Sequence, residues 1–371
     1  MSKRILIVHA TGGMGHVTAA KAVTEVFQTE YRDVEVKNVN ILDYANRFYR
    51  TVFVDGYNWL STNEPALWGR LYKIFNNPSR QKLPTVLSQW AIEKRFITFI
   101  KEFKPDFIIS THPLPMHIIS HSKRRDVIDI PSSMVLTDFG CHSYWVDSEV
   151  NFYFVATDDV AKCLVNYQVK REHIVVTGIP IEPKFTATID RKKIAAANGF
   201  DPDKFTLLIV GGQFGYGEMV KIIRQVRTQR REAQIMVVAG RDTQLQAALD
   251  QTDITGDKNV KVFGFVSNMH ELMTAADVIF SKAGGLTVSE CMAKQLPMVI
   301  HKVIPGQEED NVSYLAAKGA ALRAGSIDEI ISHIVTLAGD EKKLAEMKKS
   351  CAAISRPESA RALAKFSYQH S

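Results

Sequence analysis

The chain has 371 residues, of which 46% are hydrophobic and 23% are charged, and its formal net charge is +6. This composition is ordinary for a soluble globular protein, and the length suggests roughly two domains, each large enough for its own core. No apolar run approaches the ~20 residues that a membrane-spanning helix needs. The apolar run that follows Lys3 and Arg4 is too short for a signal peptide. Helical membrane spans are therefore excluded at this stage.

The four cysteines are Cys141, Cys163, Cys291 and Cys351. They lie far apart in the sequence and form no Cys-x-x-Cys pair. We therefore expect four free thiols, as in a protein of the reducing cytoplasm.

The first predicted strand covers residues 4–10, an apolar run without alternation that is typical of a parallel sheet covered on both faces. A glycine-rich turn at residues 11–16 follows, and residues 17–29 have the composition of a helix. The turn lacks the GxGxxG spacing of dinucleotide-binding domains and the lysine of a P-loop. His16 lies at the start of the helix. A lone histidine is more often structural than catalytic, but a glycine loop at the carboxyl edge of a sheet favours a functional role.

Residues 34–40 give a second strand, and residues 44–100 then break the alternation of strands and helices. This segment is helix-like and carries many aromatic residues among basic ones: Phe48, Tyr49, Phe53, Tyr57, Trp59, Trp68, Tyr72, Phe75 and Trp90. Between Tyr44 and Lys104 there are ten basic residues against four acidic ones, which points to an anionic surface. Such a mixture suits a membrane interface. The alternatives are rings packed into the core, or a platform for single-stranded nucleic acid, for which no RNA-binding motif is present.

Four further strands are predicted at residues 106–112, 132–138, 151–157 and 173–178. His112 with Pro113 follows the first of them, and Asp138 with Phe139 follows the second. Open α/β sheets place ligand-contacting groups at these carboxyl ends. Residues 178–183 contain two prolines and no helical pattern, which predicts a linker.

A second alternating series starts at residues 206–212 and continues with strands at 233–240, 259–265, 277–281, 297–301 and 320–323. Six strands in each half, with helices between them, predict an α/β protein of two Rossmann-like, doubly wound domains that face a cleft. From Asp340 onward the sequence is helical and polar, with Pro357 interrupting it. We assign residues 1–183 to an N-terminal domain, 184–355 to a C-terminal domain and 356–371 to a C-terminal helical tail.

The main candidate for a binding site is the turn after the predicted strand at 277–281. Gly284 and Gly285 would let the backbone approach a ligand closely, and the following helix N-terminus offers unpaired N–H groups and partial positive charge. This pattern predicts a phosphate-binding turn. Glu290, about a turn and a half into the helix, could accept hydrogen bonds from a ribose diol. The alternative is an ordinary βα turn with a solvated Glu290, because glycine-rich turns are common.

A series of short motifs runs through both halves of the chain: Gly13-Met14-Gly15-His16, Thr111-His112-Pro113, Thr137-Asp138-Phe139 with His142 and Trp145, Val176 to Pro180, Gly264-Phe265, Lys282 to Thr287 with Glu290, and Pro305 to Glu308 with Asn311. Each motif is weak alone. Together and in this order they resemble the two-Rossmann (GT-B) glycosyltransferases of family 28 that make glycolipids, namely monogalactosyldiacylglycerol synthase and the processive diacylglycerol glucosyltransferases. The N-acetylglucosaminyltransferase that completes lipid II is a more distant relative.

The resemblance implies that the C-terminal half binds a UDP-sugar, with Phe265 beside the uracil, Glu290 on the ribose and the glycine turns on the diphosphate. The implied donor-binding residues are Gly211, Gly212, Gln213, Phe265, Val266, Lys282, Gly284, Gly285, Leu286, Thr287 and Glu290, together with Gln307, Glu308 and Asn311, which would read the sugar hydroxyls. The N-terminal half would take the lipid acceptor. The implied acceptor and membrane residues are Gly13, Met14, Gly15, His112, Pro113, Trp59, Trp68, Arg70 and Lys73.

The implied reaction is a direct displacement at the anomeric carbon of the sugar by an acceptor hydroxyl, with inversion and loss of UDP. A base must take the hydroxyl proton. His16 is the first candidate because its ordinary pKa is near neutral, and Asp138 is the competitor. His16 has two alternative roles: contact with an anionic lipid or the donor phosphate, and a purely structural one. Helix N-termini can stabilise the diphosphate charge, so we expect no metal and no bound cofactor, and Asp201-Pro202-Asp203 is better interpreted as a turn than as a metal site.

Two rival functions stay open at this stage. A UDP-sugar epimerase would bind its substrate between the same two domains, but it would not need the aromatic and basic segment. A non-catalytic subunit that only binds a nucleotide sugar would show no turnover, so substitutions at the site could not reduce it. N-acetylglucosaminyl transfer to another lipid is a further alternative. We expect diacylglycerol and anionic lipids as partners, no nucleic acid, and a cytoplasmic protein that is peripheral on the inner face of the cell membrane. The sequence does not decide between UDP-glucose and UDP-galactose.

Overall fold

The computed structural model describes residues 2–11, 14–45, 86–211, 215–303 and 306–371, together with Gly56, Glu64, Leu67, Gly69, Arg70, Ile74 and Asn76. For residues 86–91 and 307 it describes the backbone alone. Most of the segment 44–100 therefore lies outside the described residues, and with it Trp59, Trp68 and Lys73.

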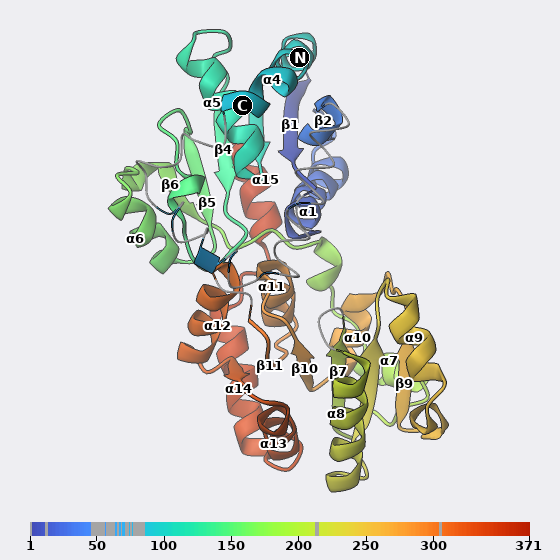
Figure 1. Ribbon diagram of the computed structural model, residues 1–371. Coiled ribbons are helices and arrows are strands. Elements are labelled where there is room, and N and C mark those ends of the chain that lie inside the picture. The colour runs from blue at the N-terminus through green and yellow to red at the C-terminus, as the bar shows by residue number, and fades with distance from the viewer. Residues whose placement is uncertain are drawn as a thin grey trace.

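The chain forms two lobes, and each lobe is built on its own sheet (Figure 1). The first sheet has six strands in the order β2-β1-β3-β4-β5-β6. Their bounds are β1 Lys3–His9, β2 Val34–Asn40, β3 Phe107–Ser110, β4 Ser132–Val135, β5 Phe152–Val155 and β6 Ile174–Val176. All of these pairings are parallel. The central strands are buried on both faces, as their unbroken apolar runs predict.

The second sheet also has six parallel strands, in the order β12-β11-β10-β7-β8-β9. Their bounds are β7 Thr206–Val210, β8 Gln234–Val238, β9 Val260–Phe263, β10 Val278–Ser281, β11 Met298–Ile300 and β12 Ala321–Arg323. The predicted α/β class, with six strands in each half, is confirmed.

Helices cover both sheets. In the first half the α-helices are α1 Met14–Glu30, α4 Val86–Phe103, α5 Pro113–Arg124 and α6 Asp158–Asn166. In the second half they are α7 Arg191–Ala197, α8 Tyr216–Gln229, α9 Thr243–Asp250, α10 Met269–Ala275, α11 Gly285–Ala293, α12 Gln307–Ala317, α13 Ile327–Leu337, α14 Glu341–Ile354 and α15 Ser359–Gln369. Short 3-10 turns lie at Ile41–Tyr44, Ser143–Trp145, Arg171–His173, Pro183–Phe185 and Asp253–Gly256. No described helix is both long and apolar enough to cross a bilayer.

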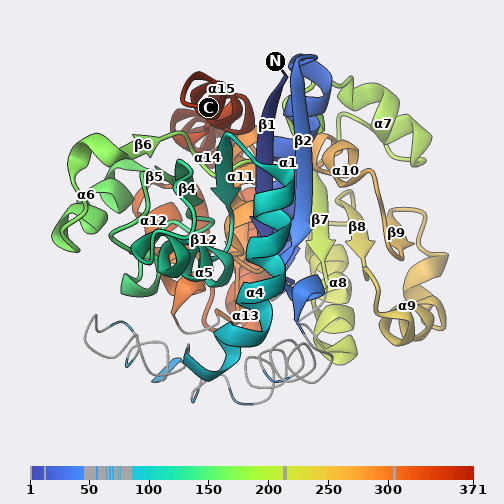
Figure 2. The same ribbon diagram turned by 90° about the horizontal axis from the view of Figure 1, so that it is seen from above.

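The last helix, α15, leaves the second lobe and packs on the first (Figures 1 and 2). Leu363 and Ala364 are fully buried against the first sheet, in a cluster with Ile5 and Phe107. The break near Pro357 is confirmed, because α14 ends at Ile354 and α15 begins at Ser359. However, the polar character predicted for the tail holds on only one face of α15. The domain limits at 183/184 and 355/356 stay predictions.

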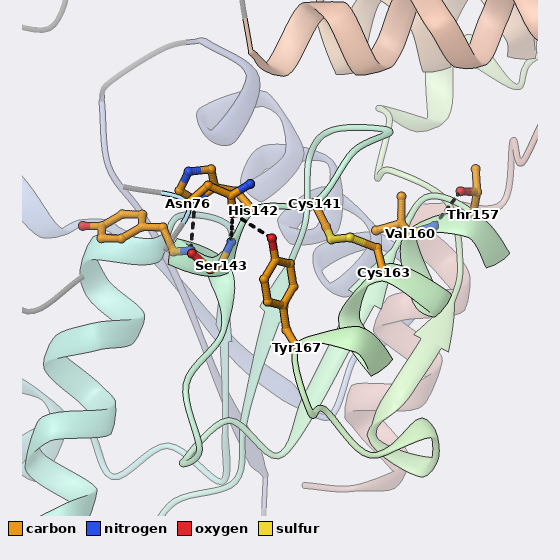
Figure 3. Close-up of a disulfide and its surroundings, with 9 residues drawn as sticks. Asn76, Cys141, His142, Ser143, Thr157, Val160, Cys163 and Tyr167 are labelled. Atoms are coloured by element: carbon orange, nitrogen blue, oxygen red, sulfur yellow. Dashed lines mark hydrogen bonds between the residues drawn. A yellow bond between two sulfur atoms is a disulfide. The ribbon is translucent and has the colours of Figure 1, made fainter. Parts of the chain in front are cut away.

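A disulfide joins Cys141 to Cys163, so the expectation of four free thiols is wrong for these two residues (Figure 3). The physical reason is the pairing of β4 with β5. Neighbouring parallel strands bring the loop after β4 and the helix after β5 to the same edge of the sheet, and the two Cα atoms lie 6.4 Å apart. Cys291 and Cys351 are free and buried.

Candidate active site

The strand orders define where a ligand can bind. The order reverses between β1 and β3 in the first sheet and between β7 and β10 in the second. Ligands of open α/β sheets bind beyond the carboxyl ends of the strands at such switch points. The strands at these points lead into α1, α5, α8 and α11, and predicted site residues lie before or within the first turn of each of these helices.

The two switch points face each other across the lobe boundary. A Cβ placed on Gly15, in the first turn of α1, would lie 3.6 Å from Leu286 in the first turn of α11. Met14 beside it is 62% exposed. Both helix N-termini carry unpaired N–H groups and partial positive charge, so an anion at this boundary would be stabilised from both sides. The phosphate-binding role of the turn stays a prediction.

The glycines of the predicted turn have different surroundings. Gly284 is the N-cap of α11, and a Cβ there would have only Lys282 nearby. Gly285 is buried, and a Cβ there would run into the backbone carbonyl of Thr137 in the other lobe. Gly211 is closed in by the side chains of Met219 and Leu245. The close approaches for which we expected glycine at 285 and 211 are therefore made to protein atoms.

Glu290 is a desolvated carboxyl group between the lobes. No hydrogen bond or ion pair is found for it among the described residues, and burial raises its pKa from 4.5 to about 8. The nearby charges are Glu182, which raises the pKa further, and Lys184, which lowers it. Glu182 in turn binds Lys21 at 2.6 Å and Lys184 at 3.0 Å. The side chain is half-buried, and a desolvated carboxyl to which the described residues offer no partner is a candidate for hydrogen bonds from a ligand.

Phe265 follows β9 and is 66% exposed. The guanidinium of Arg241 lies 5.1 Å from its ring centre, and Val266 packs on the core behind it. An exposed ring beside a cation can take a planar base on its face.

The start of α12 carries the residues expected to read the sugar. Glu308 is only 6% exposed, and its carboxylate lies 3.5 Å from Lys282 Nζ. Asn311 is fully buried: its Oδ1 accepts a hydrogen bond from Phe139 N–H at 2.7 Å, and its Nδ2 donates to Ala283 O at 2.8 Å and to Asp138 Oδ1 at 3.3 Å. The side chain of Gln307 lies outside the described residues.

His16 is held in one tautomer. Its Nδ1 lies 2.7 Å from Thr111 O and 3.1 Å from Thr137 Oγ1. Because a carbonyl oxygen can only accept, Nδ1 carries the proton and the lone pair is on Nε2. The described part of the chain offers Nε2 no hydrogen-bond partner. Desolvation lowers the pKa of His16 to about 4, below the near-neutral value for which the sequence favoured it as the base.

Asp138 shows the opposite change. Burial raises the pKa of its carboxyl to about 6, although the hydrogen bond from Asn311 lowers it; Glu308 and Asp310 add to the increase. A base works best when its pKa lies near the working pH. By this criterion Asp138 is better tuned than His16.

The structure places most of the remaining predicted site residues as well. His112 caps α5 by accepting from Leu114 N–H at 3.1 Å, and its ring centre lies 4.7 Å from that of His16. Pro113 begins α5 and is buried, Thr287 is half-buried in α11, and Arg70 is exposed. Gly13, Gly212 and Gln213 lie outside the described residues.

Thr137, which the sequence placed in a strand-end motif, contacts both His16 and the Gly285 corner. Sequence reasoning assigned no role to Asn76, which accepts hydrogen bonds from Ser143 N–H and Tyr167 Oη near the disulfide, both at 2.8 Å (Figure 3). In the sequence, the ion pairs of Glu182 are indicated only by its position as a lone acidic residue between the two prolines of the linker. Asp201 and Asp203 lie in a turn, as predicted, and within the described ranges no three His, Cys, Asp or Glu residues are placed to hold a metal ion.

Comparison with known proteins assigns the family. A family model described as "Monogalactosyldiacylglycerol (MGDG) synthase" matches residues 16–181, and one described as "Glycosyltransferase family 28 C-terminal domain" matches residues 206–363. The chain is 34% identical over 360 residues to a "Processive diacylglycerol beta-glucosyltransferase" of Bacillus mycoides (strain KBAB4), covering 96% of this chain and 91% of that protein. A protein with the same name from Bacillus thuringiensis (strain Al Hakam) is 33% identical over 360 residues, with the same coverage.

Solved structures agree on the fold. MurG of Acinetobacter baumannii has a TM-score of 0.64 at 17% identity and covers 99% of both chains. UDP-GlcNAc 2-epimerase from Neisseria meningitidis, bound to UDP-GlcNAc, has a TM-score of 0.66 at 14% identity and covers 99% of this chain and 100% of that one. At these identities the likeness concerns the fold alone, which is of the GT-B type. The matches in sequence go further: the chain belongs to glycosyltransferase family 28, together with the processive diacylglycerol β-glucosyltransferases.

Proposed function

We propose that the protein is a glycolipid synthase that transfers glucose or galactose from a UDP-sugar to diacylglycerol, or to a glycosyl-diacylglycerol, with inversion at the membrane surface. The relatives that are 33–34% identical over nearly the whole chain are named diacylglycerol glucosyltransferases. In the structure, the observation that carries the proposal is Glu290, a half-buried carboxyl in the second turn of α11 to which the described residues offer no hydrogen-bond or ion-pair partner.

The donor would lie across the carboxyl edge of the second sheet. Phe265 offers a face to the uracil, Glu290 accepts the ribose hydroxyls, and the N-termini of α1 and α11 stabilise the diphosphate. As UDP leaves, negative charge grows on the diphosphate, and fixed N–H dipoles stabilise it without reorganisation. Gln307 and Glu308 are the proposed contacts of the sugar hydroxyls.

Two groups are candidates for the base that removes the proton from the acceptor hydroxyl. His16 presents an unprotonated Nε2, because its Nδ1–H donates to Thr111 O. Asp138 has the pKa closer to neutral, about 6 against about 4 for His16. We propose Asp138 as the base and His16 as the group that accepts a hydrogen bond from the acceptor and orients it. General base catalysis of this kind contributes about 10²–10⁴-fold to the rate.

We propose that the protein binds peripherally to the inner face of the cell membrane through its N-terminal half, which takes the lipid acceptor. The support is the basic surplus between Tyr44 and Lys104 and the exposed Arg70, since anionic lipid attracts such segments. The free-thiol argument for a reducing compartment no longer applies to Cys141 and Cys163.

The test is direct. Purified protein is incubated with labelled UDP-glucose or UDP-galactose and vesicles that contain diacylglycerol, and the lipid fraction is analysed for glycolipid. We expect label in the lipid with at least one donor and a loss of turnover in Asp138→Asn. Absence of glycolipid with every donor would overturn the proposal. Conversion of the donor sugar without any acceptor would favour the epimerase, for which the structures offer likeness of fold alone.

A further inference from the structure

Lys302 follows the carboxyl end of β11, one of the two neighbours of β10 in the second sheet. Its ammonium group lies 2.6 Å from a carboxylate oxygen of Glu218. Glu218 belongs to the first turn of α8, and α8 follows β7, the other neighbour of β10. Because β10 lies between these two strands, the ion pair spans its carboxyl end (Figure 1). The predicted phosphate-binding turn at Gly284 and Gly285 follows that strand end.

The backbone of Lys302 is in the left-handed region, with a φ of 55°. Residues other than glycine rarely adopt this conformation. The other described non-glycine residues with a positive φ lie within two residues of a helix end, where a left-handed residue is a common terminator: Lys104, Asp126, Gln168 and Gln295. Lys302 follows a strand instead. Backbone strain concentrates at ligand clamps and active sites, so its conformation is a second reason to assign Lys302 a function.

Glu218 has two partners that its carboxylate shares. The oxygen that binds Lys302 also accepts the Gly215 N–H at 3.0 Å and so caps α8. Partial burial raises the pKa of Glu218, but the hydrogen bonds from Lys302 and Gly215 outweigh it and hold the pKa below its ordinary value. The Lys302 and Glu218 side chains are 40% and 29% exposed. An ion pair that open to water contributes little stability, so an arriving anion can displace the carboxylate.

A second lysine at the same edge has a similar arrangement. Lys282 follows β10, and its Nζ lies 3.5 Å from the carboxylate of Glu308 in the first turn of α12. Lysines after two neighbouring strands are thus each held by a carboxylate from the start of a helix. A helix N-terminus offers about half an elementary charge, which is less than a diphosphate carries. A lysine ammonium, which binds phosphate as a point charge, adds to it.

We propose that Lys302 binds the diphosphate of the donor, and that Glu218 is the counter-ion that holds its ammonium over the end of β10 until the donor replaces it. The proposal rests on the proposed function and adds a cation to which the sequence motifs gave no role. In the exchange the ammonium gives up a carboxylate oxygen for a phosphate oxygen, and Glu218 keeps its hydrogen bond from Gly215. The same positive charge would stabilise the negative charge that grows on the diphosphate as UDP leaves.

The test compares the affinities of UDP and of uridine, which lacks the phosphates, measured by calorimetry. Lys302→Met should weaken UDP binding about 10-fold, the scale of a hydrogen bond to a charged group. Uridine binding should stay unchanged, because the substitution leaves the base and ribose contacts in place. An equal loss for both ligands, or no loss for UDP, overturns the proposal.

Glu218→Gln distinguishes this role from that of a purely structural ion pair. Glutamine still accepts the Gly215 N–H and caps α8, but it carries no charge. If the carboxylate competes with the diphosphate for Lys302, this variant should bind UDP more tightly, by up to about fivefold for a pair exposed to solvent. If the pair only fastens α8 to the chain after β11, Glu218→Gln should weaken UDP binding as Lys302→Met does. That result, or an unchanged UDP affinity, overturns the proposal.

Two further variants control for folding and for charge. Lys302→Gly removes the side chain, and glycine adopts a left-handed backbone without strain. This variant should unfold at no lower a temperature than the unsubstituted protein and still lose UDP affinity; retained affinity overturns the proposal. Lys221→Met removes the partner of Asp328, at 2.8 Å, from the same helix α8. It should change neither affinity, and a loss of UDP affinity equal to that of Lys302→Met would reveal a general charge effect and overturn the proposal too.

Failure of this proposal and failure of the proposed function give different results, because UDP binding needs no turnover. If the unsubstituted protein binds UDP but makes no glycolipid, the proposed function fails, and the binding ratios still decide the role of Lys302. If glycolipid forms and Lys302→Met keeps the ratio of UDP to uridine affinity, the role of Lys302 alone fails.

Discussion

Replacement of Glu290 by glutamine should stabilise the protein and weaken donor binding, with both effects set by pH. The pKa of Glu290 is raised from 4.5 to about 8 by burial. Between these values the carboxyl is ionised in the unfolded chain and protonated in the folded protein. The folded state then binds more protons, so its stability falls as pH rises, by about 1.4 kcal/mol for each pH unit.

At pH 7 this penalty amounts to about 3 kcal/mol, because pH 7 lies 2.5 units above the ordinary value of 4.5. Glutamine stays neutral at every pH and avoids it. We therefore expect Glu290→Gln to unfold several degrees higher than the unsubstituted protein at pH 7 to 8, and the difference to vanish as pH falls below 4.5, where the unfolded chain becomes protonated as well. Thermal unfolding across this pH range measures it.

Donor binding should show the reverse trend. Only the ionised carboxylate accepts hydrogen bonds from both ribose hydroxyls, so UDP-glucose affinity should rise by up to tenfold per pH unit between pH 6 and 8 and be flat in Glu290→Gln. Calorimetry at several pH values checks this. Glu232→Gln, an exposed residue of the same lobe, is the control. Two results would refute this reasoning. One is a stability gain of Glu290→Gln over the unsubstituted protein that is no larger at pH 7.5 than at pH 4.5. The other is a UDP-glucose affinity of Glu290→Gln that still depends on pH as it does in the unsubstituted protein.

Three further predictions concern the base, the disulfide and the membrane. The kcat/KM of the unsubstituted enzyme should fall as pH drops through about 6, where Asp138 is protonated; a fall that begins only near pH 4 would assign the base to His16. Titration of the denatured, unreduced protein should find two thiols rather than four, and Cys163→Ser should lower the free energy of unfolding by about 3 kcal/mol, because the bridge closes a segment of 22 residues. Charge reversal at Arg47, Arg50, Arg70 and Lys73 should abolish flotation with anionic vesicles, whereas neutral vesicles should bind neither form; flotation that is indifferent to the four changes would speak against the membrane role.

The sequence by itself determined the elements of the fold. Parallel strands buried on both faces need continuous apolar runs, and glycine-rich turns mark their carboxyl ends, so twelve strands could be placed from local pattern alone. The same local signals singled out His16, Asp138, the Gly284–Gly285 turn and Glu290, because the chemistry of strand ends does not depend on distant parts of the chain. The family resemblance rested on these motifs as well.

Only the tertiary structure decided how those residues behave. Cys141 and Cys163 meet because β4 pairs with β5, and nothing in their spacing indicates it. The pKa of His16 is lowered to about 4 and that of Asp138 is raised to about 6, because desolvation in the folded protein disfavours the charged form of each. The docking also turned Asn311 inward, gave Gly285 a backbone neighbour and returned α15 to the first sheet. These are contacts between residues distant in the chain, and a local pattern carries no record of them.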